Sequence, residues 1–525
     1  MQLRFSFRAA AQLASFAGVF TGTCLLGQVS LAQSDKVDRL WGSHCASCHG
    51  DDGEGVEGKA KTLLTRELFD QKYDRAFFET VRASTKDAHH KFEKELSDGQ
   101  AWGVINHLRE KQNQSLREQF GSISSKLDSQ GACTTQRAKF KFQTIVDKGL
   151  DTPWAVDWLP NKVGQPLRMI ITNRGGAINV FEIASGRVGE DGVLSDKVEG
   201  TPKSVEVGQG GMLDVAVHPD YASEGNGWIY LTFTKPIKDR ATMTTLVRGR
   251  LVKTDGKWKW TDEQTLWECK PEHAIASGLH FGSRIAFGPK ITQGDGSGKR
   301  HVFFTIGERG QAPHAQDVAR PNGKVHRIYD DGTIPADNPF VSDSNAYASI
   351  YSYGHRNPQG LVFGTDGSLW DTEHAPRGGD EFNQVLKGRN YGWPVVSFGI
   401  NYSGDILKTP WPDVEGENAM KLNIMMPTAR FLPSIAACGL CVVDEGPQGE
   451  AFPDWRGDFF AGGLAGETVQ RLRVAKGTDG TYSLVEREEI LQGMGRVRDV
   501  ECAPDGSLVV VLEGVDKIVR LVPVK

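Results

Sequence analysis

A loose internal repeat restricts the fold of this chain more than any other feature of its sequence. Short β-rich segments that end in a proline or an Asp-Gly turn recur six times, and most are followed by a second β-rich segment. Residues 139–525 leave about 64 residues for each unit, enough for four strands and their loops. A two-sheet sandwich would not need six similar hairpins, so we predict an all-β six-bladed β-propeller. The six segments are Trp154–Pro160, Leu213–Pro219, Arg284–Pro289, Gly360–Gly367, Gly439–Asp444 and Asp499–Gly506.

The same repeat predicts where a functional site lies. In a propeller, the first strands of all blades start around one mouth of the central channel, so polar residues just before them converge. Cations, an imidazole and amides at matched positions indicate a pocket for a polyanionic ligand that accepts hydrogen bonds. The residues at these positions are Gln209, His280, Arg356 with Asn357, and Arg496 with Arg498.

The segment Cys45-Ala46-Ser47-Cys48-His49 fits covalent attachment of a c-type haem. Two thiols three residues apart can form thioethers to a porphyrin, and the adjacent histidine can bind the iron. A bare C-x-x-C pair also suits zinc or thiol redox chemistry, but the histidine, the glycine-rich run Gly50–Gly55 and an upstream export signal favour haem. We predict that Cys45 and Cys48 bind haem c, that His49 ligates it, and that it carries single electrons.

Residues 33–113 around this motif show helical patterns at both ends. Apolar residues with helical spacing precede the motif, and Ser97 or Asp98 can cap a later helix with one apolar face. The region resembles a small class I cytochrome c, which implies an all-α domain at the N-terminal side whose first helix packs on its last.

The chain departs from that family at the sixth ligand of the iron. The usual ligand is a methionine, but no methionine occurs between Met1 and Met169. The matching position is His89, which we predict as the sixth ligand. Ligation by His90, and five-coordinate iron with both histidines exposed, are the alternatives. Two imidazole ligands lower the reduction potential relative to one imidazole and one thioether.

Residues 1–32 have the pattern of a signal peptide. Arg4 and Arg8 precede a largely apolar stretch, and Ser30-Leu31-Ala32 offers small residues for cleavage. An uncleaved anchor helix is the alternative. No later stretch is apolar enough to span a bilayer, so a periplasmic or secreted protein without an integral membrane segment is expected. Removal of the leader takes the formal net charge from −5 to about −7, which favours no nucleic-acid partner.

The cysteines outside the haem motif leave their pairing open. Cys133, Cys269, Cys438, Cys441 and Cys502 remain after leader cleavage, an odd number for an oxidising compartment. A small disulfide between Cys438 and Cys441 and ordinary buried thiols are both compatible with the spacing. Residues 114–138 are polar and lack a periodic apolar face, so we predict a linker there.

Six long motifs stand out in the repeat region: Gly208–Leu213, Gly332–Pro339, Gly354–Gly360, Glu373–Asn383, Gly388–Pro394 and Arg496–Asp499. With these motifs, the region resembles the soluble PQQ-dependent glucose/sorbosone dehydrogenase family. The resemblance covers nearly all of residues 145–525, and the motif Thr305–Arg309 is closer to the branch that accepts many aldoses.

The resemblance implies a role for each site residue. His280 matches the base that takes the proton of the anomeric hydroxyl while hydride passes to the quinone. Gln209 and Arg356 match groups beside the quinone oxygens, where a guanidinium can stabilise negative charge. Asn357, Arg496 and Arg498 match residues that hold PQQ, and the two arginines, two positions apart on a strand, point the same way.

The resemblance also implies calcium. Ala375 and Pro376 match positions whose backbone carbonyls bind the Ca²⁺ that bridges to PQQ. Asp380 and Glu381 match acids near a second calcium, or they brace the loop. Two departures stand out: Ala465 replaces a lysine that the family uses for the cofactor, and Glu308 stands where the glucose enzyme has aspartate.

These features predict an exported dehydrogenase that oxidises a small-molecule aldose at PQQ. Electrons would pass through the haem to an external acceptor, a cytochrome or a quinone. The alternatives are a propeller that binds glycans or proteins without catalysis, and a PQQ dehydrogenase for non-sugar alcohols.

Overall fold

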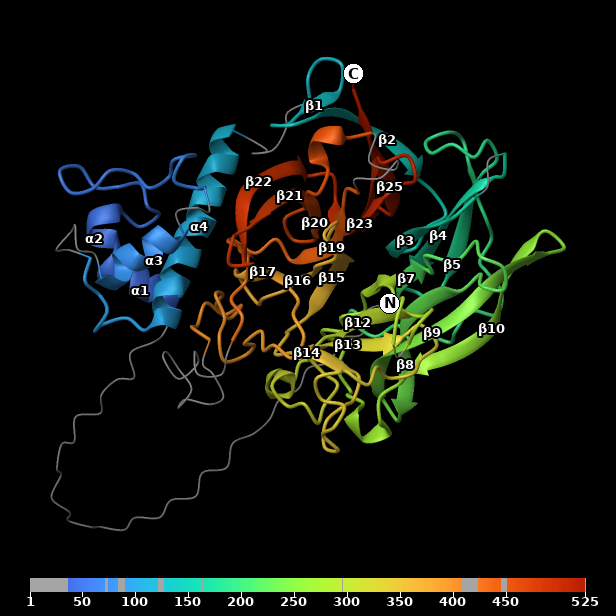
Figure 1. Ribbon diagram of the computed structural model, residues 1–525. Helices are drawn as coiled ribbons and strands as arrows, with labels where there is room; N and C mark the ends of the chain where they lie inside the picture. The colour runs from blue at the N-terminus through green and yellow to red at the C-terminus, as the bar shows by residue number, and fades with distance from the viewer. Residues whose placement is uncertain are drawn as a thin grey trace, which may run out of the picture. The chain divides into compact units, whose positions relative to one another are not determined.

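The computed structural model describes residues 36–70, 74–83, 90–120, 127–161, 164–294, 296–407, 424–444 and 451–524. The predicted signal peptide and His89 lie outside these residues. The described residues all fall within one compact unit, Asp35–Lys525. Four helices come first in the chain, and strands make up most of the rest (Figure 1). Among the described residues, no helix is both long and apolar enough to cross a membrane.

The strands form six antiparallel sheets, five of four strands and one of five. The first four sheets follow one another along the chain. The first sheet contains β3 (Pro153–Leu159), β4 (Leu167–Asn173), β5 (Ile178–Ile183) and β6 (Val193–Leu194), and the second contains β7 (Met212–Val217), β8 (Ile229–Lys238), β9 (Ala241–Thr254) and β10 (Lys257–Trp267). The third sheet contains β11 (Ile285–Lys290), β12 (Arg300–Ile306), β13 (Lys324–Tyr329) and β14 (Ile350–Tyr353). The fourth sheet contains β15 (Pro358–Phe363), β16 (Leu369–Glu373), β17 (Asp380–Gln384) and β18 (Ala429–Phe431).

The last two sheets complete the ring. They contain β19 (Ala437–Val442), β20 (Phe459–Gly463), β21 (Thr468–Lys476) and β22 (Tyr482–Gln492); and β23 (Arg496–Cys502), β24 (Leu508–Glu513) and β25 (Lys517–Pro523) joined by β1 (Ala132–Thr134) and β2 (Lys139–Val146). Short 3₁₀ helices at Pro271–His273, Ala312–Ala315 and Pro453–Trp455 lie in the connections.

This arrangement is a six-bladed β-propeller, which confirms the predicted fold class. Each of the six predicted repeat segments overlaps the first strand of one sheet: β3, β7, β11, β15, β19 or β23. Each first strand contacts the first strands of the two neighbouring sheets, so these six strands line the central channel. Apolar side chains fill the spaces between adjacent sheets, as where Trp154 and Ile170 of one sheet pack with Met212 and Val247 of the next.

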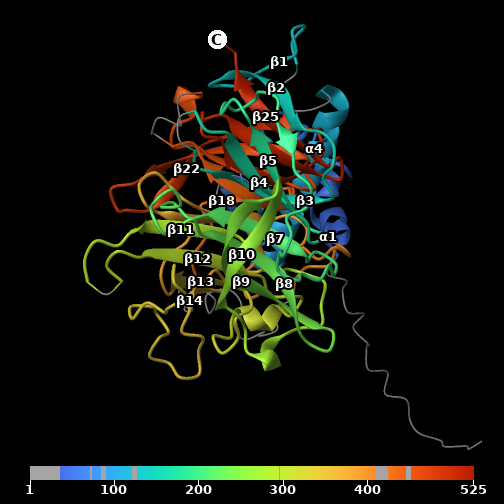
Figure 2. The ribbon, with the colours of Figure 1, turned by 90° about the vertical axis from the view of Figure 1, so that its right-hand side faces the viewer.

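The ring is closed by pairing between the two ends of the propeller sequence. Strand β2 pairs antiparallel with β25, with Phe142 opposite Leu521. Figure 1 shows β1 and β2 beside the red strand β25, and Figure 2 shows β3 to β5 close to the same sheet. The sixth blade therefore combines the first and last strands of the propeller.

Buried charges join the blades across the channel. The Arg284 guanidinium forms ion pairs with Asp214 at 2.9 Å and Asp499 at 2.7 Å, and it donates to the carbonyl oxygens of Gln359 and Arg498. Burial raises the pKa of Asp499 to about 7, an effect that the Arg284 charge opposes. One guanidinium thus ties four blades together below the predicted site.

The helical region has the packing expected of a small cytochrome c domain. Helix α1 (Val37–His44) contacts α4 (Asp98–Phe120), with Trp41 packed against Val104 and Leu108. Helices α2 (Ala46–His49) and α3 (Asp74–Ala83) lie between them in the sequence, and all four are blue in Figure 1. Trp102 and Ile105 of α4 share an apolar cluster with Phe398 and Leu432, so this region packs directly on the propeller.

The prediction for residues 114–138 needs correction. Helix α4 continues through the first part of this segment, and Ala132–Thr134 forms strand β1. The exposed face of a long helix is polar, so a lack of apolar periodicity in its last turns did not indicate a linker.

The structure contains no disulfide among the cysteines that it describes. The pair Cys438 and Cys441 is therefore not bridged. The Cys441 Sγ atom lies 3.8 Å from the Sγ atom of Cys502 on the neighbouring first strand.

Candidate functional site

His280 is held in place by contacts on both sides. Its backbone N–H donates to Oε1 of Gln209 at 2.8 Å, and the Gln209 N–H donates to the carbonyl of Gly278 at 2.8 Å. The imidazole Nδ1 hydrogen-bonds to Oε1 of Glu308. His280 adopts a φ of +50°, which is rare for a residue with a side chain and is typical of functional sites. Because Glu308 occupies Nδ1, Nε2 is the ring nitrogen available for proton transfer.

Burial and nearby charges set the protonation of His280. Burial lowers the pKa of His280 below its usual value, the bonded Glu308 opposes this, and Arg356 adds to the lowering. Only 8% of His280 and 2% of Glu308 are exposed. The imidazole is therefore neutral near neutral pH, the state that a general base requires.

Arg356 and Asn357 leave buried polar atoms without partners. Arg356 Nη1 donates to the carbonyl oxygens of His374 and Ala375, at 3.0 and 3.1 Å, and Asn357 Oδ1 accepts from Gly282 N–H at 3.0 Å. Arg356 Nε and Asn357 Nδ2 have no hydrogen-bond partner among the described atoms. Buried donors without partners are rare, so these two atoms fit a ligand rich in acceptors, such as PQQ.

The predicted calcium loop joins β16 to β17. The carbonyl oxygen of Ala375 already accepts from Arg356, but a carbonyl has a second lone pair for a cation. Pro376 lies next to it on the same loop. Asp380 accepts from the backbone N–H groups of Ala375 and Ile435 and from the Ser434 hydroxyl. This bonding fits a brace for the loop better than a calcium ligand.

Glu381 lies beside other acids. The Asn383 amide donates both to Glu381, at 3.1 Å, and to Glu373, at 3.2 Å. Burial and the nearby Glu373 raise the pKa of Glu381 well above its usual value. Arg430 is the cation that opposes this rise.

The two arginines of β23 differ in their surroundings. Arg498 is 5% exposed, donates to Glu513 at 2.6 Å and to Gln359 at 3.0 Å, and lies over the Trp154 ring. The Arg496 side chain is 47% exposed and pairs with Glu513 at 3.6 Å. Both reach the same carboxylate, although the pairing of β23 with β24 shifts register between Val497 and Asp499.

His374 lies in the same region as these groups. The sequence analysis did not select His374 as a site residue. Burial lowers the pKa of His374 well below its usual value, and the charges of Arg356, Arg498 and His280 add to that effect. Its Nε2 atom has no partner among the described atoms. The geometry joins these groups as well: Arg356 donates to the His374 carbonyl, and the N–H of Glu308, which binds the His280 ring, donates to the Arg356 carbonyl at 2.8 Å. The position of His374 next to the predicted carbonyl ligand Ala375 was the signal available in the sequence.

Glu308 and Arg309 are further site residues that the repeat pattern missed. The Arg309 guanidinium lies 3.6 Å from the centroid of the Phe281 ring and donates to the carbonyl of Leu279 at 2.9 Å. It thus fixes the residues on both sides of His280. A β-carbon on Gly307 would clash with the His280 carbonyl, which explains the glycine before this pair.

The haem motif consists of Cys45, which follows α1, and the short helix α2. Cys45 joins the two helices, and its carbonyl accepts from the N–H groups of Cys48 and His49, which places these residues on one turn. The Trp41 indole donates to the carbonyl of Gly50 at 3.0 Å. Burial raises the pKa of the Cys45 thiol to about 12, so it is neutral until it reacts. The adjacent thiols and imidazole fit covalent haem.

Helix α4 contacts the predicted calcium loop directly. The Glu110 carboxylate binds the Arg377 guanidinium through two hydrogen bonds, at 2.8 and 2.7 Å, and Asn106 donates to the Arg377 carbonyl at 3.2 Å. A β-carbon on Gly378 would overlap the Asn106 side chain. The haem region and the cofactor loop are thus joined through Ala375–Gly378.

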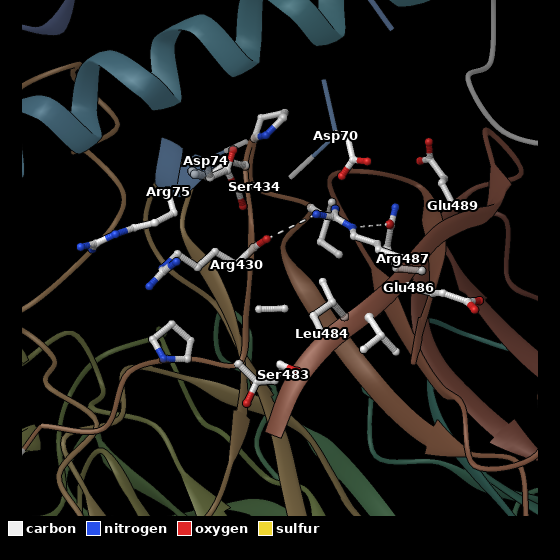
Figure 3. A pocket seen from close by; sticks show the side chains of 18 of the residues that line it. Asp70, Asp74, Arg75, Arg430, Ser434, Ser483, Leu484, Glu486, Arg487 and Glu489 are labelled. Atoms are coloured by element: carbon white, nitrogen blue, oxygen red, sulfur yellow. Dashed lines mark hydrogen bonds between the residues drawn. The ribbon is translucent and has the colours of Figure 1, made fainter. Parts of the chain in front are cut away.

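A pocket of about 1840 Å³ separates other parts of α3 and α4 from the propeller. Figure 3 shows Arg430 and Arg487 in it, with Asp74 and Arg75 on one side and Leu484 on the other. Its described lining includes Ala465 but none of the residues predicted for catalysis. We therefore place the candidate active site at His280 rather than in this pocket.

Comparisons with known proteins agree with this division. A family model described as "Glucose / Sorbosone dehydrogenase" matches residues 150–520, and one described as "Cytochrome C oxidase, cbb3-type, subunit III" matches residues 32–108. The chain is 36% identical over 379 residues to the aldose sugar dehydrogenase YliI of Escherichia coli (strain K12), covering 72% of this chain and 91% of that protein.

Solved structures show the same fold. The apo-form of the soluble aldose sugar dehydrogenase from Escherichia coli superimposes with a TM-score of 0.60 and 34% identity, over 73% of this chain and 100% of that one. The PQQ-bound form of an aldose sugar dehydrogenase from Streptomyces coelicolor, at 24% identity, gives a TM-score of 0.52 over 73% of this chain and 98% of that one.

Proposed function

Because the chain belongs to the glucose/sorbosone dehydrogenase family and carries a cytochrome c domain, we propose that it oxidises an aldose at PQQ and passes the electrons through haem c. Membership of the family makes the chain an oxidoreductase of the soluble aldose dehydrogenase type.

Proton removal from the sugar falls to His280. Its Nε2 takes the proton of the anomeric hydroxyl, and Glu308 keeps the opposite nitrogen protonated and stabilises the imidazolium that results. Gln209 holds the backbone of the base, so the ring does not have to be ordered during the reaction.

The other side chains bind the cofactor. Bound PQQ would supply a quinone that accepts the hydride, and with it both electrons of the oxidation, and Ca²⁺ would polarise the quinone. Arg356 and Asn357 present their unpartnered N–H groups to it, and Arg498 and Arg496 match its carboxylates. Ala375 and Pro376 would offer carbonyl oxygens to Ca²⁺. Asp380 holds this loop in shape.

The haem region receives the electrons. Haem c accepts one electron at a time, whereas sugar oxidation releases two. Helix α4 contacts the loop that would hold calcium, through Glu110 and Arg377, and this contact supports transfer within one chain. A cytochrome or quinone outside the protein would then take the electrons. The leader-like residues 1–32 support a site of action in the periplasm or outside the cell.

One observation carries this proposal: a buried imidazole fixed by a carboxylate lies beside buried N–H donors that have no partner among the residues described above. The test adds PQQ and Ca²⁺ to the purified apoprotein and measures dye reduction on a panel of aldoses and simple alcohols. Turnover of aldoses supports the proposal, and turnover of alcohols alone would make the substrate assignment wrong. Absence of PQQ uptake with retained glycan binding would favour a non-catalytic propeller.

A further inference from the structure

His90 faces the haem-motif histidine at close range. The Nε2 atoms of His49 and His90 are 3.5 Å apart, and the ring centroids are 5.8 Å apart with 31° between the planes. The two residues come from opposite ends of the haem region, 41 positions apart in the sequence. Both rings therefore present to each other the nitrogen that can bind a metal.

The spacing is close to that of two ligands on one metal ion. An N–H hydrogen bond in a protein is usually about 2.7–3.2 Å long, so 3.5 Å is long for direct bonding. Bonds from a metal to an imidazole nitrogen are about 2 Å, so two imidazoles on opposite sides of one ion have nitrogens about 4 Å apart. A small outward movement of either ring is enough to admit iron.

Each ring is held by its own surroundings. On the His49 side, the Trp41 indole fixes the end of α2 through the Gly50 carbonyl. On the other side, the Phe92 N–H donates to the carbonyl of Val81 at 3.2 Å, which fixes the segment after His90 to α3. The Phe92 ring meets the His90 ring edge-on at 6.4 Å. The approach of the two histidines thus depends on packing from two separate helices.

We propose that His90 is the second axial ligand of the haem iron, opposite His49. The proposal rests on the haem attachment proposed above and deepens it. It replaces His89, the residue that the sequence count selected, with its neighbour. No methionine is present between Met1 and Met169, so this part of the chain supplies no thioether for the position.

Two consequences follow for electron transfer. Two imidazole ligands place the potential below that of a cytochrome with one histidine and one methionine. Because both axial positions are filled from the protein, external ligands such as carbon monoxide reach the iron only by displacing a histidine. The centre is then suited to electron transfer rather than to ligand binding.

The test uses the full-length haem-loaded protein with His90→Ala and, as a matched control, His89→Ala. Haem content is measured first by the pyridine haemochrome assay. Wild-type protein without covalent haem would refute the haem attachment itself and leave the sugar chemistry untouched. With haem present in all three proteins, optical and electron paramagnetic resonance spectra report on the ligands.

We expect a low-spin spectrum for the wild type and His89→Ala, without the charge-transfer band of iron–methionine ligation. His90→Ala is expected to become high-spin, to bind carbon monoxide, and to return to low spin when imidazole is added. His90→Met is expected to stay low-spin with a raised potential. A low-spin spectrum in His90→Ala together with loss of low spin in His89→Ala would overturn the assignment, as would unchanged spectra in both. Circular dichroism of each variant excludes unfolding as the cause.

Discussion

The propeller site and the haem site are built in different ways. In the propeller, Gln209 holds the backbone of His280 and Glu308 holds its ring. In the haem region, His49 lies at the end of a four-residue helix and its ring faces that of His90. The first site is shaped before its ligand arrives, whereas bonds to the haem complete the second. Groups that are already in position lower the activation free energy, because they need not reorganise during the reaction. At a metal site, the bonds to the metal can themselves fix the positions of the ligands.

The largest effect is expected when the two cysteines that would form the thioethers are replaced, because this variant should lose the haem and keep the propeller site. We predict that Cys45→Ala combined with Cys48→Ala abolishes covalent haem, because nothing else in the described structure attaches it. Uptake of PQQ by the propeller should persist, since none of its ligands comes from α1 or α2. Pyridine haemochrome and a PQQ titration check this. Cys269→Ala, which removes a buried propeller thiol, is the control and should keep its haem. Loss of PQQ uptake in the double variant would show that the propeller site also depends on haem.

Substitution of Glu308 tests whether protein contacts alone prepare His280. We predict that Glu308→Gln lowers kcat by about 10²–10⁴-fold, because the imidazolium loses its stabilising carboxylate. Glu308 raises the pKa of His280 against burial, so its loss should lower that pKa further. The base then stays deprotonated to lower pH, and the acid limb of kcat/KM should move to lower pH.

The pH profile of kcat/KM for both proteins provides the measurement. Exposed Glu199, which pairs with Lys257, supplies the control Glu199→Gln. An acid limb that moves to higher pH would contradict this account of the Glu308 charge.

A smaller effect is expected where the two regions touch. A β-carbon on Gly103 of α4 would lie 2.5 Å from Cδ1 of Ile406 and 3.2 Å from Ile400. In an isolated helix, alanine is favoured over glycine by about 1 kcal/mol. We predict that Gly103→Ala instead destabilises the protein by about 1–3 kcal/mol, because the docked surfaces leave no room.

The matched control for this docking test is Gly99→Ala on the same helix. Its β-carbon would lie 3.6 Å from Ile406, which is an ordinary contact. Urea unfolding of both variants gives the comparison, and equal stability of the two would mean that α4 does not pack on the propeller as described.

The smallest effect concerns cofactor affinity in the propeller. We predict that Ala465→Lys lowers the Kd for PQQ by only about 3- to 10-fold, since it restores the cation that the family uses but at an exposed position where solvent weakens its effect. Ala465→Met adds similar bulk without charge and should leave the Kd unchanged. Fluorescence titration at two salt concentrations measures both variants. Equal gains in the two would assign the effect to packing rather than to charge.

The fold of the propeller could be predicted because its units repeat. Each predicted segment overlaps the first strand of one sheet. These strands place His280, Arg356 and Arg498 near His374. Glu308 was noted only as a departure from the family, because a single carboxylate in a loop has no periodic pattern. Its role emerges only from its hydrogen bond to the His280 ring.

The haem region was less predictable beyond its five-residue motif. Counting residues from a helix start selected His89, which lies outside the described residues. In the structure, the His90 ring faces the ring of the motif histidine His49, and a backbone hydrogen bond from Phe92 to α3 holds this segment in place. No local sequence pattern predicts that hydrogen bond. The end of α4 was missed for a related reason, since its last turns are mostly polar and Leu116 is the one apolar side chain in residues 113–119.

The pairing of β2 with β25 imposes an order on biosynthesis. Strand β2 leaves the ribosome early, yet its partner, Lys517–Pro523, is among the last residues to be made. The helical region and the first five blades are therefore complete in sequence before the last strand is made, and closure of the ring waits for β25.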